Sequence, residues 1–288
     1  MAIESLRALE KASENRDIFE VILDSDCTDR GVSREASLEK MHALYAAIRR
    51  AREGYDPALR SASGMVGGDG AKMREYVQKG KTICGDYIGQ VIAQALEMGE
   101  SNACMKCIVA APTAGSCGVL PAVLLPYQAR EGLDDDAMVR AMYIAGAIGQ
   151  VVATKASIAG AAGGCQAEIG TASAMGAAAL CYLGGGSAQA VCHAAAIAIK
   201  SMLGLVCDPI AGLVEVPCVK RNAAGAMIAM SSADMALAGI RSAVPPDEVI
   251  LAMREVGDKM DVSLKETGVG GVAGTPFGQK IAEKMGVL

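Results

Sequence analysis

Three of the ten cysteines, Cys165, Cys207 and Cys218, stand in settings that suit metal chemistry. Each lies beside glycine or proline, in a segment without the periodicity of a helix or a strand. Irregular segments can direct thiolates and backbone N–H groups toward one point, and the sulfurs of an iron–sulfur cluster accept such N–H groups. The spacing leaves a second interpretation open, because cysteines in an alanine-rich chain often serve only as small packing residues.

Cys104 and Cys107 form a C-x-x-C pair, a spacing found in zinc sites and in redox-active thiol pairs. A zinc site would need a second pair, and the sequence has none at finger or ribbon spacing. A thioredoxin-like pair would need alternating strands and helices, which the sequence pattern also lacks. We therefore interpret both residues as partly buried thiols without a ligand role.

A general base is harder to place, because the chain contains only two histidines. His42 lies among charged residues on an amphipathic helix, a position typical of a solvated side chain. His193 lies in an alanine-rich helix and is interpreted as a buried histidine whose hydrogen bonds are satisfied. Lys155 would serve as a base if burial lowered its pKa.

Three carboxylates flank the three cysteines: Glu168, Asp208 and Glu215. Buried carboxylates need partners, so we expect them to form ion pairs rather than to act as acids or bases. The cations that we expect to pair with them are Lys155, Lys220 and Arg221. Glu168 is also a candidate contact for the ammonium group of a substrate.

Helical periodicity dominates the elements that must position these residues. Helices are expected at residues 33–52, 86–98, 134–154, 187–203, 221–240 and 245–260, with a short one after Pro276. Glycine-rich loops are expected at residues 63–70, 110–118, 157–164 and 266–271, and an irregular segment at 207–218. We predict an all-α fold, a single compact Ala/Gly-rich helical domain over residues 1–288 whose glycine-rich loops converge on the cysteine site. Residues 1–31 are expected to form a peripheral N-terminal segment.

Composition supports this prediction and excludes several classes of protein. Of the 288 residues 52% are hydrophobic, yet there is no Trp and only two Phe, which favours close-packed helices over a β-sandwich. The net charge is −5 without a basic stripe, which argues against nucleic acid as a partner. Ten irregularly spaced cysteines, with charges at Glu4 and Arg7 instead of a signal peptide, indicate a reduced, cytoplasmic protein.

One uncharged stretch, residues 169–199, is long enough to cross a membrane. It is dominated by alanine, which drives membrane insertion far less than leucine or phenylalanine does, and it contains Gly184, Gly185 and Gly186 in a row. We interpret it as two buried helices joined by a glycine turn, in a protein without a membrane partner.

Three long segments resemble a known family. They are IVAAPTAGSCG at residues 108–118, KASIAGAAGGCQAEIG at 155–170 and LVCDPIAGLVEVPCVKRN at 205–222. They resemble the α subunit of the iron–sulfur-dependent L-serine dehydratases, or L-serine ammonia-lyases, and the likeness extends from about residue 33 to the tail. The resemblance implies a lyase without pyridoxal phosphate that converts L-serine to pyruvate and ammonia, in amino-acid degradation and gluconeogenesis.

The resemblance also implies a cofactor. In this family three cysteines hold a [4Fe–4S] cluster, and they fall here on Cys165, Cys207 and Cys218. Three thiolates leave one iron without a protein ligand, and an open metal position can act as a Lewis acid on the serine hydroxyl. The family pairs this subunit with a smaller β subunit, or fuses the two, so the resemblance implies a β partner that could supply the base.

A serine substrate would need hydrogen-bond donors for its carboxylate. The candidates are Thr113, Ser116 and Gly118 in one glycine-rich loop, Ser157 and Gly160 in the next, and Thr267 and Gly268 in the last. Hydroxyl residues in such loops also cap helices, which is the alternative role for each of them. We favour the first loop.

Three other functions remain as alternatives. A dehydratase that uses pyridoxal phosphate on Lys155 would need alternating strands and helices, and few strands are expected. A helical membrane carrier would use the stretch at residues 169–199. A scaffold that binds iron without turnover would share the cysteine site but not the reaction.

Overall fold

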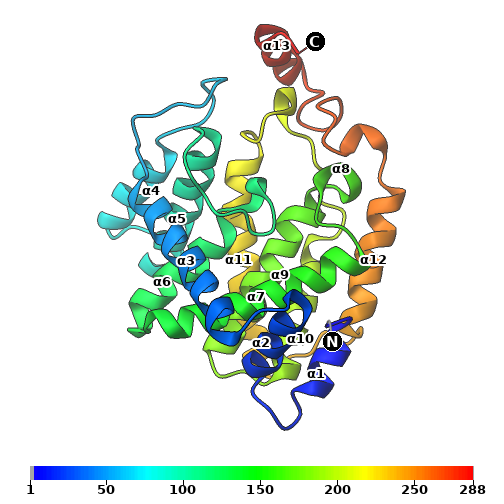
Figure 1. The fold of residues 1–288 in the computed structure, drawn as a ribbon. Coiled ribbons are helices and arrows are strands. Elements are labelled where there is room, and N and C mark those ends of the chain that lie inside the picture. Colours follow the sequence, from blue (N-terminus) through cyan, green and yellow to red (C-terminus); the bar gives the residue numbers. More distant parts are fainter. Residues whose placement is uncertain (1–2, 288) are drawn as a thin grey trace.

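The computed structural model describes residues 3–287, and within that range it consists of helices and loops without a β-strand (Figure 1). The α-helices are α1 (Leu6–Ala12), α2 (Ile18–Arg30), α3 (Arg34–Glu53), α4 (Asp69–Gln78), α5 (Asp86–Ala103), α6 (Val119–Glu131), α7 (Asp135–Lys155), α8 (Gly160–Gly163), α9 (Thr171–Leu183), α10 (Ala188–Met202), α11 (Cys218–Leu237), α12 (Pro246–Lys259) and α13 (Pro276–Met285). Shorter turns are η1 (Ala114–Ser116), η2 (Gln166–Gly170), η3 (Ile210–Gly212) and η4 (Val262–Leu264). The predicted all-α fold in one compact domain is confirmed.

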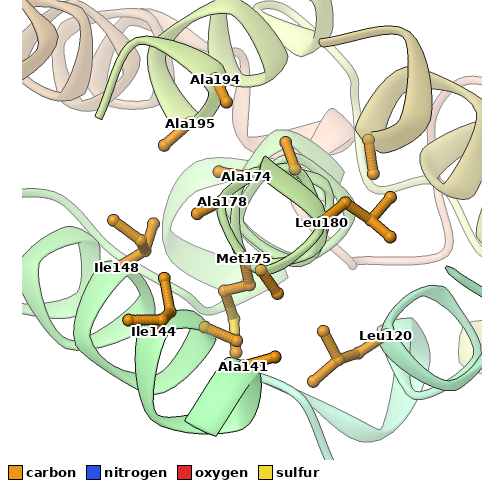
Figure 2. Close-up of a cluster of buried hydrophobic side chains, with 14 of the residues drawn as sticks. Leu120, Ala141, Ile144, Ile148, Ala174, Met175, Ala178, Leu180, Ala194 and Ala195 are labelled. Atoms are coloured by element: carbon orange, nitrogen blue, oxygen red, sulfur yellow. The ribbon is translucent and has the colours of Figure 1, made fainter. Parts of the chain in front are cut away.

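Helix α9 lies at the centre and packs against α6, α7, α10 and α11 (Figure 1). Its side chains are nearly all small and buried, so neighbouring helices approach it closely. Figure 2 shows Ala174 and Ala178 of α9 among Ile148 of α7 and Ala195 of α10, while Met175 fills the larger gap toward α7. A core without tryptophan therefore reaches close packing through alanine.

Several helices begin at the capping residues that their sequences suggest. Ser33 caps α3, Asp134 caps α7 and Ser187 caps α10, each through a side-chain oxygen that accepts a backbone N–H of the first turn. These bonds satisfy donors that have no partner inside the helix. The starts of these helices agree with the sequence prediction to within one residue.

Two predictions about the elements were wrong. The N-terminal segment is not peripheral, because Leu6, Leu9, Phe19 and Leu23 of α1 and α2 belong to the main hydrophobic core. The irregular segment ends earlier than expected, because Cys218 is already the first residue of α11. Pro217 precedes it and is compatible with a helix start, since proline needs no N–H partner there.

The uncharged stretch at residues 169–199 contains all of α9 and most of α10, joined by the turn at Gly184, Gly185 and Gly186, as predicted. A different helix, α7, is the one among the described residues that is long and apolar enough to cross a bilayer. Of its most apolar window 67% is buried inside the fold.

Candidate functional site

The three candidate ligand cysteines are all buried and come from three separate segments. Cys165 has 2% of its surface exposed, Cys207 3% and Cys218 8%. Cys165 directly precedes the π-helical turn η2, a distortion that often marks a functional site. Cys207 is held from the tail, because its N–H donates to Leu264 O and its carbonyl accepts from Glu266 N.

The three thiols lie close enough to affect one another. Burial is the main cause that raises the pKa of each thiol, to about 11 for Cys165 and to about 12 for Cys218, and it also raises the pKa of Cys207. Negative charge on Cys165 further raises the pKa of Cys207 and of Cys218. Three thiolates at this place therefore need a cation to stabilise them.

Gly160, the first residue of α8, has to be a glycine because of its position beside Cys207 in this group. A Cβ on Gly160 would lie 2.8 Å from Cys207 Sγ and 2.7 Å from Glu168 Oε2, both closer than real Cβ contacts. The backbone of Gly160 thus lies directly against a thiol and a carboxylate. Among the predicted substrate contacts, this residue is the one that touches a candidate ligand cysteine.

Glu168 lies beside Cys207, and no cation among residues 3–287 pairs with it. Its Oε1 accepts from Thr113 Oγ1 at 2.7 Å, and its Oε2 lies 3.8 Å from the Cys207 Sγ that donates to it. Burial raises the pKa of this carboxyl, and the Thr113 hydrogen bond opposes the effect. The predicted ion pair is wrong for Glu168, because Lys155 and Lys220 pair with other carboxylates, Asp247 and Asp69.

The other two flanking carboxylates differ from each other. Asp208 forms the predicted ion pair, with its Oδ1 2.8 Å from Arg221 Nη2. Glu215 instead accepts the hydroxyls of Ser61 and Ser63, which lie in the loop between α3 and α4. That loop, residues 54–68, is thereby attached to the segment between Cys207 and Cys218.

The first glycine-rich loop is braced by Asn222, a buried residue of α11 that the sequence analysis missed. Its Oδ1 accepts the Gly118 N–H at 2.8 Å, and its Nδ2 donates to Gly115 O at 2.8 Å. The Ser116 hydroxyl is fully buried and bonded within the loop. Of the three contacts predicted here, Thr113 is the one that faces the cysteine group, through Glu168.

The remaining predicted contacts lie in other surroundings. Ser157 Oγ accepts the Ala159 N–H, and Thr267 Oγ1 donates to Ser263 O. Both hydroxyls therefore form hydrogen bonds to the backbone of their own loops. Gly268 has a positive φ and lies against Gly212, in the segment between Cys207 and Cys218. The substrate roles of these residues stay predictions.

The candidate bases are engaged with other groups. Lys155 ends α7, and its Nζ lies 3.8 Å from Asp247, whose carboxylate accepts the N–H groups of Leu6 and Arg7. This contact ties Lys155 to the start of α1, and its role as a base stays a prediction. His193 Nδ1 accepts the Ser242 N–H at 3.2 Å, as expected for a satisfied histidine.

The C-x-x-C pair follows α5. Cys104 is partly buried as predicted, whereas Cys107 is exposed, because the chain leaves the helix through Met105, which has a positive φ. Both are free thiols. Neither belongs to the buried group of Cys165, Cys207 and Cys218.

The three thiols are of the ligand type that holds iron–sulfur clusters. All three are buried and affect one another, and Gly160 leaves the space beside Cys207 free of a side chain. The residues present therefore fit a [4Fe–4S] cluster. Within residues 3–287 no three His, Cys, Asp or Glu side chains gather as one metal ion would require.

Fold and site together define an all-α protein with a buried three-cysteine centre beside a carboxylate. The chain belongs to the serine dehydratase alpha chain family, whose profile matches residues 6–273. The family resemblance drawn from the sequence is therefore confirmed.

Individual relatives agree with this assignment. The chain is 49% identical to the probable L-serine dehydratase alpha chain of Bacillus subtilis, over 85% of this chain and 80% of that one. It is 43% identical to the L-serine dehydratase alpha chain of Peptoniphilus asaccharolyticus, over 92% and 91%. The L-serine dehydratase of Streptomyces coelicolor is 45% identical over 62% of this chain but only 40% of its own length.

Proposed function

We propose that this chain is the α subunit of an L-serine dehydratase that holds a [4Fe–4S] cluster on Cys165, Cys207 and Cys218 and works in the cytoplasm. The observation that carries the proposal is the burial of these three thiols in one group, next to Glu168. The reaction removes water from L-serine to give aminoacrylate, which tautomerises and hydrolyses to pyruvate and ammonia. When bound, the cluster supplies an iron that acts as a Lewis acid toward the leaving hydroxyl.

The chain's own residues would bind and orient the substrate. Glu168 is half-buried and has no cation among the described residues, and a carboxylate partly removed from water is stabilised by one, so we assign it to the substrate ammonium group. Thr113 donates to Oε1 of Glu168 and fixes the direction of that carboxylate. Asn222 keeps the first loop in place behind Thr113.

The base that removes the α-proton is assigned to a partner, the β subunit. Lys155 is engaged with Asp247, and His193 accepts the backbone N–H of Ser242. This chain matches only 40% of the length of the Streptomyces relative, which leaves room for a second component. We therefore expect the α subunit alone to bind the cluster but to lack turnover.

The test begins with anaerobic purification and reconstitution with iron and sulfide. We expect iron and sulfide in the wild-type chain, and pyruvate from L-serine only after the β subunit is added. Cys165→Ala, Cys207→Ala and Cys218→Ala should each lose iron, whereas Cys181→Ala, a buried cysteine of α9, should retain it. A wild-type chain without iron and sulfide, or a complete αβ enzyme that forms no pyruvate, would refute the proposal.

Inhibitors separate this proposal from a pyridoxal phosphate enzyme. Air and iron chelators should abolish activity, because the open iron is accessible to both. Hydroxylamine, which reacts with pyridoxal phosphate, should leave activity unchanged. The reverse pattern would favour the pyridoxal enzyme.

A further inference from the structure

Arg221 connects the segments that carry the cysteines. It lies in the first turn of α11, three residues after Cys218, and only 17% of its side chain is exposed. Its Nη1 donates to Val206 O at 2.7 Å, and its Nη2 lies 2.8 Å from Asp208 Oδ1. Val206 and Asp208 are the two chain neighbours of Cys207, so one guanidinium holds both sides of that cysteine.

The Cys165 segment joins this arrangement through its backbone, because Gln166 N donates to Leu205 O at 2.9 Å. Arg221 therefore connects the Cys207 and Cys218 segments directly, and the backbone bond attaches the Cys165 segment to them.

Asp208 also binds the C-terminal segment around Val272. Its Oδ2 accepts the Val272 N–H at 2.7 Å. A Cβ on Gly271 would lie 2.3 Å from that same oxygen, so only glycine allows the tail to come so close. With 3% of its side chain exposed, Asp208 is stabilised by Arg221 on one side and by this N–H on the other.

We propose that Arg221 is a positioning residue for the cluster. It fixes Cys207 relative to Cys218 through Val206 and Asp208, and it places a positive charge in the first turn of the helix that begins at Cys218. A lysine cannot replace it, because a single ammonium lacks the planar fork that reaches a carbonyl and a carboxylate together. This inference rests on the proposed cluster.

The experiment compares reconstituted wild type with Arg221→Lys and with the double variant Arg221→Met/Asp208→Asn. In the double variant neither charge is left unpaired, and the new amide can still accept the Val272 N–H, so the fold should survive. The matched control is Lys220→Gln, the adjacent residue of α11, which is 72% exposed and pairs with Asp69. Circular dichroism and thermal unfolding of the iron-free proteins check that all variants fold.

The readouts are the rate of cluster loss to an iron chelator and the midpoint potential. Residues that support metal ligands typically contribute about 10- to 100-fold to metal binding, so we expect both variants to lose the cluster at least about tenfold faster. The double variant should also show a shifted midpoint potential, because the ion pair beside Cys207 and its N–H groups are gone. A purely structural role would leave the potential of the remaining cluster unchanged.

Wild-type rates and potential in both folded variants would overturn the role of Arg221 while leaving the cluster proposal intact. The inference would also fail if Lys220→Gln matched the loss seen in the Arg221 variants. A wild-type chain that binds no cluster would refute the proposed cofactor and this inference with it.

Discussion

Gly160 and Cys207 lie so close that no side chain fits between them: a Cβ on Gly160 would be 2.8 Å from the cysteine sulfur. Carbon contacts are most favourable at about 3.5–4.0 Å, so the Gly160→Ala methyl group would have to displace the thiol or the backbone. We expect Gly160→Ala to abolish iron binding, measured as iron per chain after reconstitution.

The matched control is Gly146→Ala in α7, where a Cβ would meet no atom within 4 Å. Alanine is favoured over glycine inside a helix by about 0.5–1 kcal/mol, so this variant should be slightly more stable and should bind iron normally. Normal iron content in Gly160→Ala would contradict the assignment of this glycine to the cluster site.

Glu168→Gln tests the contact with the substrate ammonium group. The amide keeps the size of the side chain but loses its charge. A hydrogen bond to a charged group contributes about 1.5–3 kcal/mol, so kcat/KM for L-serine should fall about 10- to 100-fold while the cluster remains. The control is Glu131→Gln, an exposed residue at the end of α6. An unchanged kcat/KM in Glu168→Gln would exclude the contact.

Asn222→Ala tests the two hydrogen bonds by which Asn222 holds the first glycine-rich loop. The substitution leaves Gly118 N–H and Gly115 O without their partner, and a buried polar group left unsatisfied costs about 1–3 kcal/mol. We expect the free energy of unfolding in urea to fall by about that amount. Asn15→Ala, in the exposed turn before α2, should change it by less than about 0.5 kcal/mol. Equal effects of the two substitutions would show that the brace contributes little.

His193 should make stability depend on pH. Burial lowers its pKa below the ordinary value of 6.5, and its Nδ1 must be unprotonated to accept the Ser242 N–H. The unfolded chain therefore binds the proton more tightly than the folded chain does. This part of the stability is complete above about pH 6.5 and is lost as the pH falls toward the lower folded pKa.

The measurement is the urea midpoint of the iron-free chain between about pH 5 and 8. In His193→Asn, whose side chain does not titrate, the loss of stability below about pH 6.5 should be smaller than in the wild type. The same slope in both proteins would assign the pH dependence to other groups.

The sequence predicted the starts of helices well where the capping residue lies within one turn of the helix that it caps. Ser33, Asp134 and Ser187 each precede an apolar periodic run, and each caps a helix in the structure. The start of α11 was missed because Pro217 suggested an irregular segment, although proline also suits the residue before a helix. Local patterns predict elements well and their ends less well.

Partners across long distances in the sequence could not be predicted in this way. Glu215 pairs with Ser61 and Ser63, more than 150 residues away, instead of with a nearby cation. Asn222 showed no local signal beyond being a polar residue in a helix that is otherwise largely apolar. The gathering of Cys165, Cys207 and Cys218 was expected from a family resemblance, because their spacing alone does not require it.

The two backbone bonds between Cys207 and the tail have a consequence for the order of events during biosynthesis. Cys207 N–H needs Leu264 O, and Glu266 N–H needs Cys207 O, so these two bonds form only after residue 266 has left the ribosome. The core helices from α1 to α11 precede that point and can pack earlier. In the proposed enzyme the cluster would therefore reach its final ligand geometry only after residue 266 has been made. A chain shortened after residue 259 should keep its helical circular dichroism and fail to retain iron.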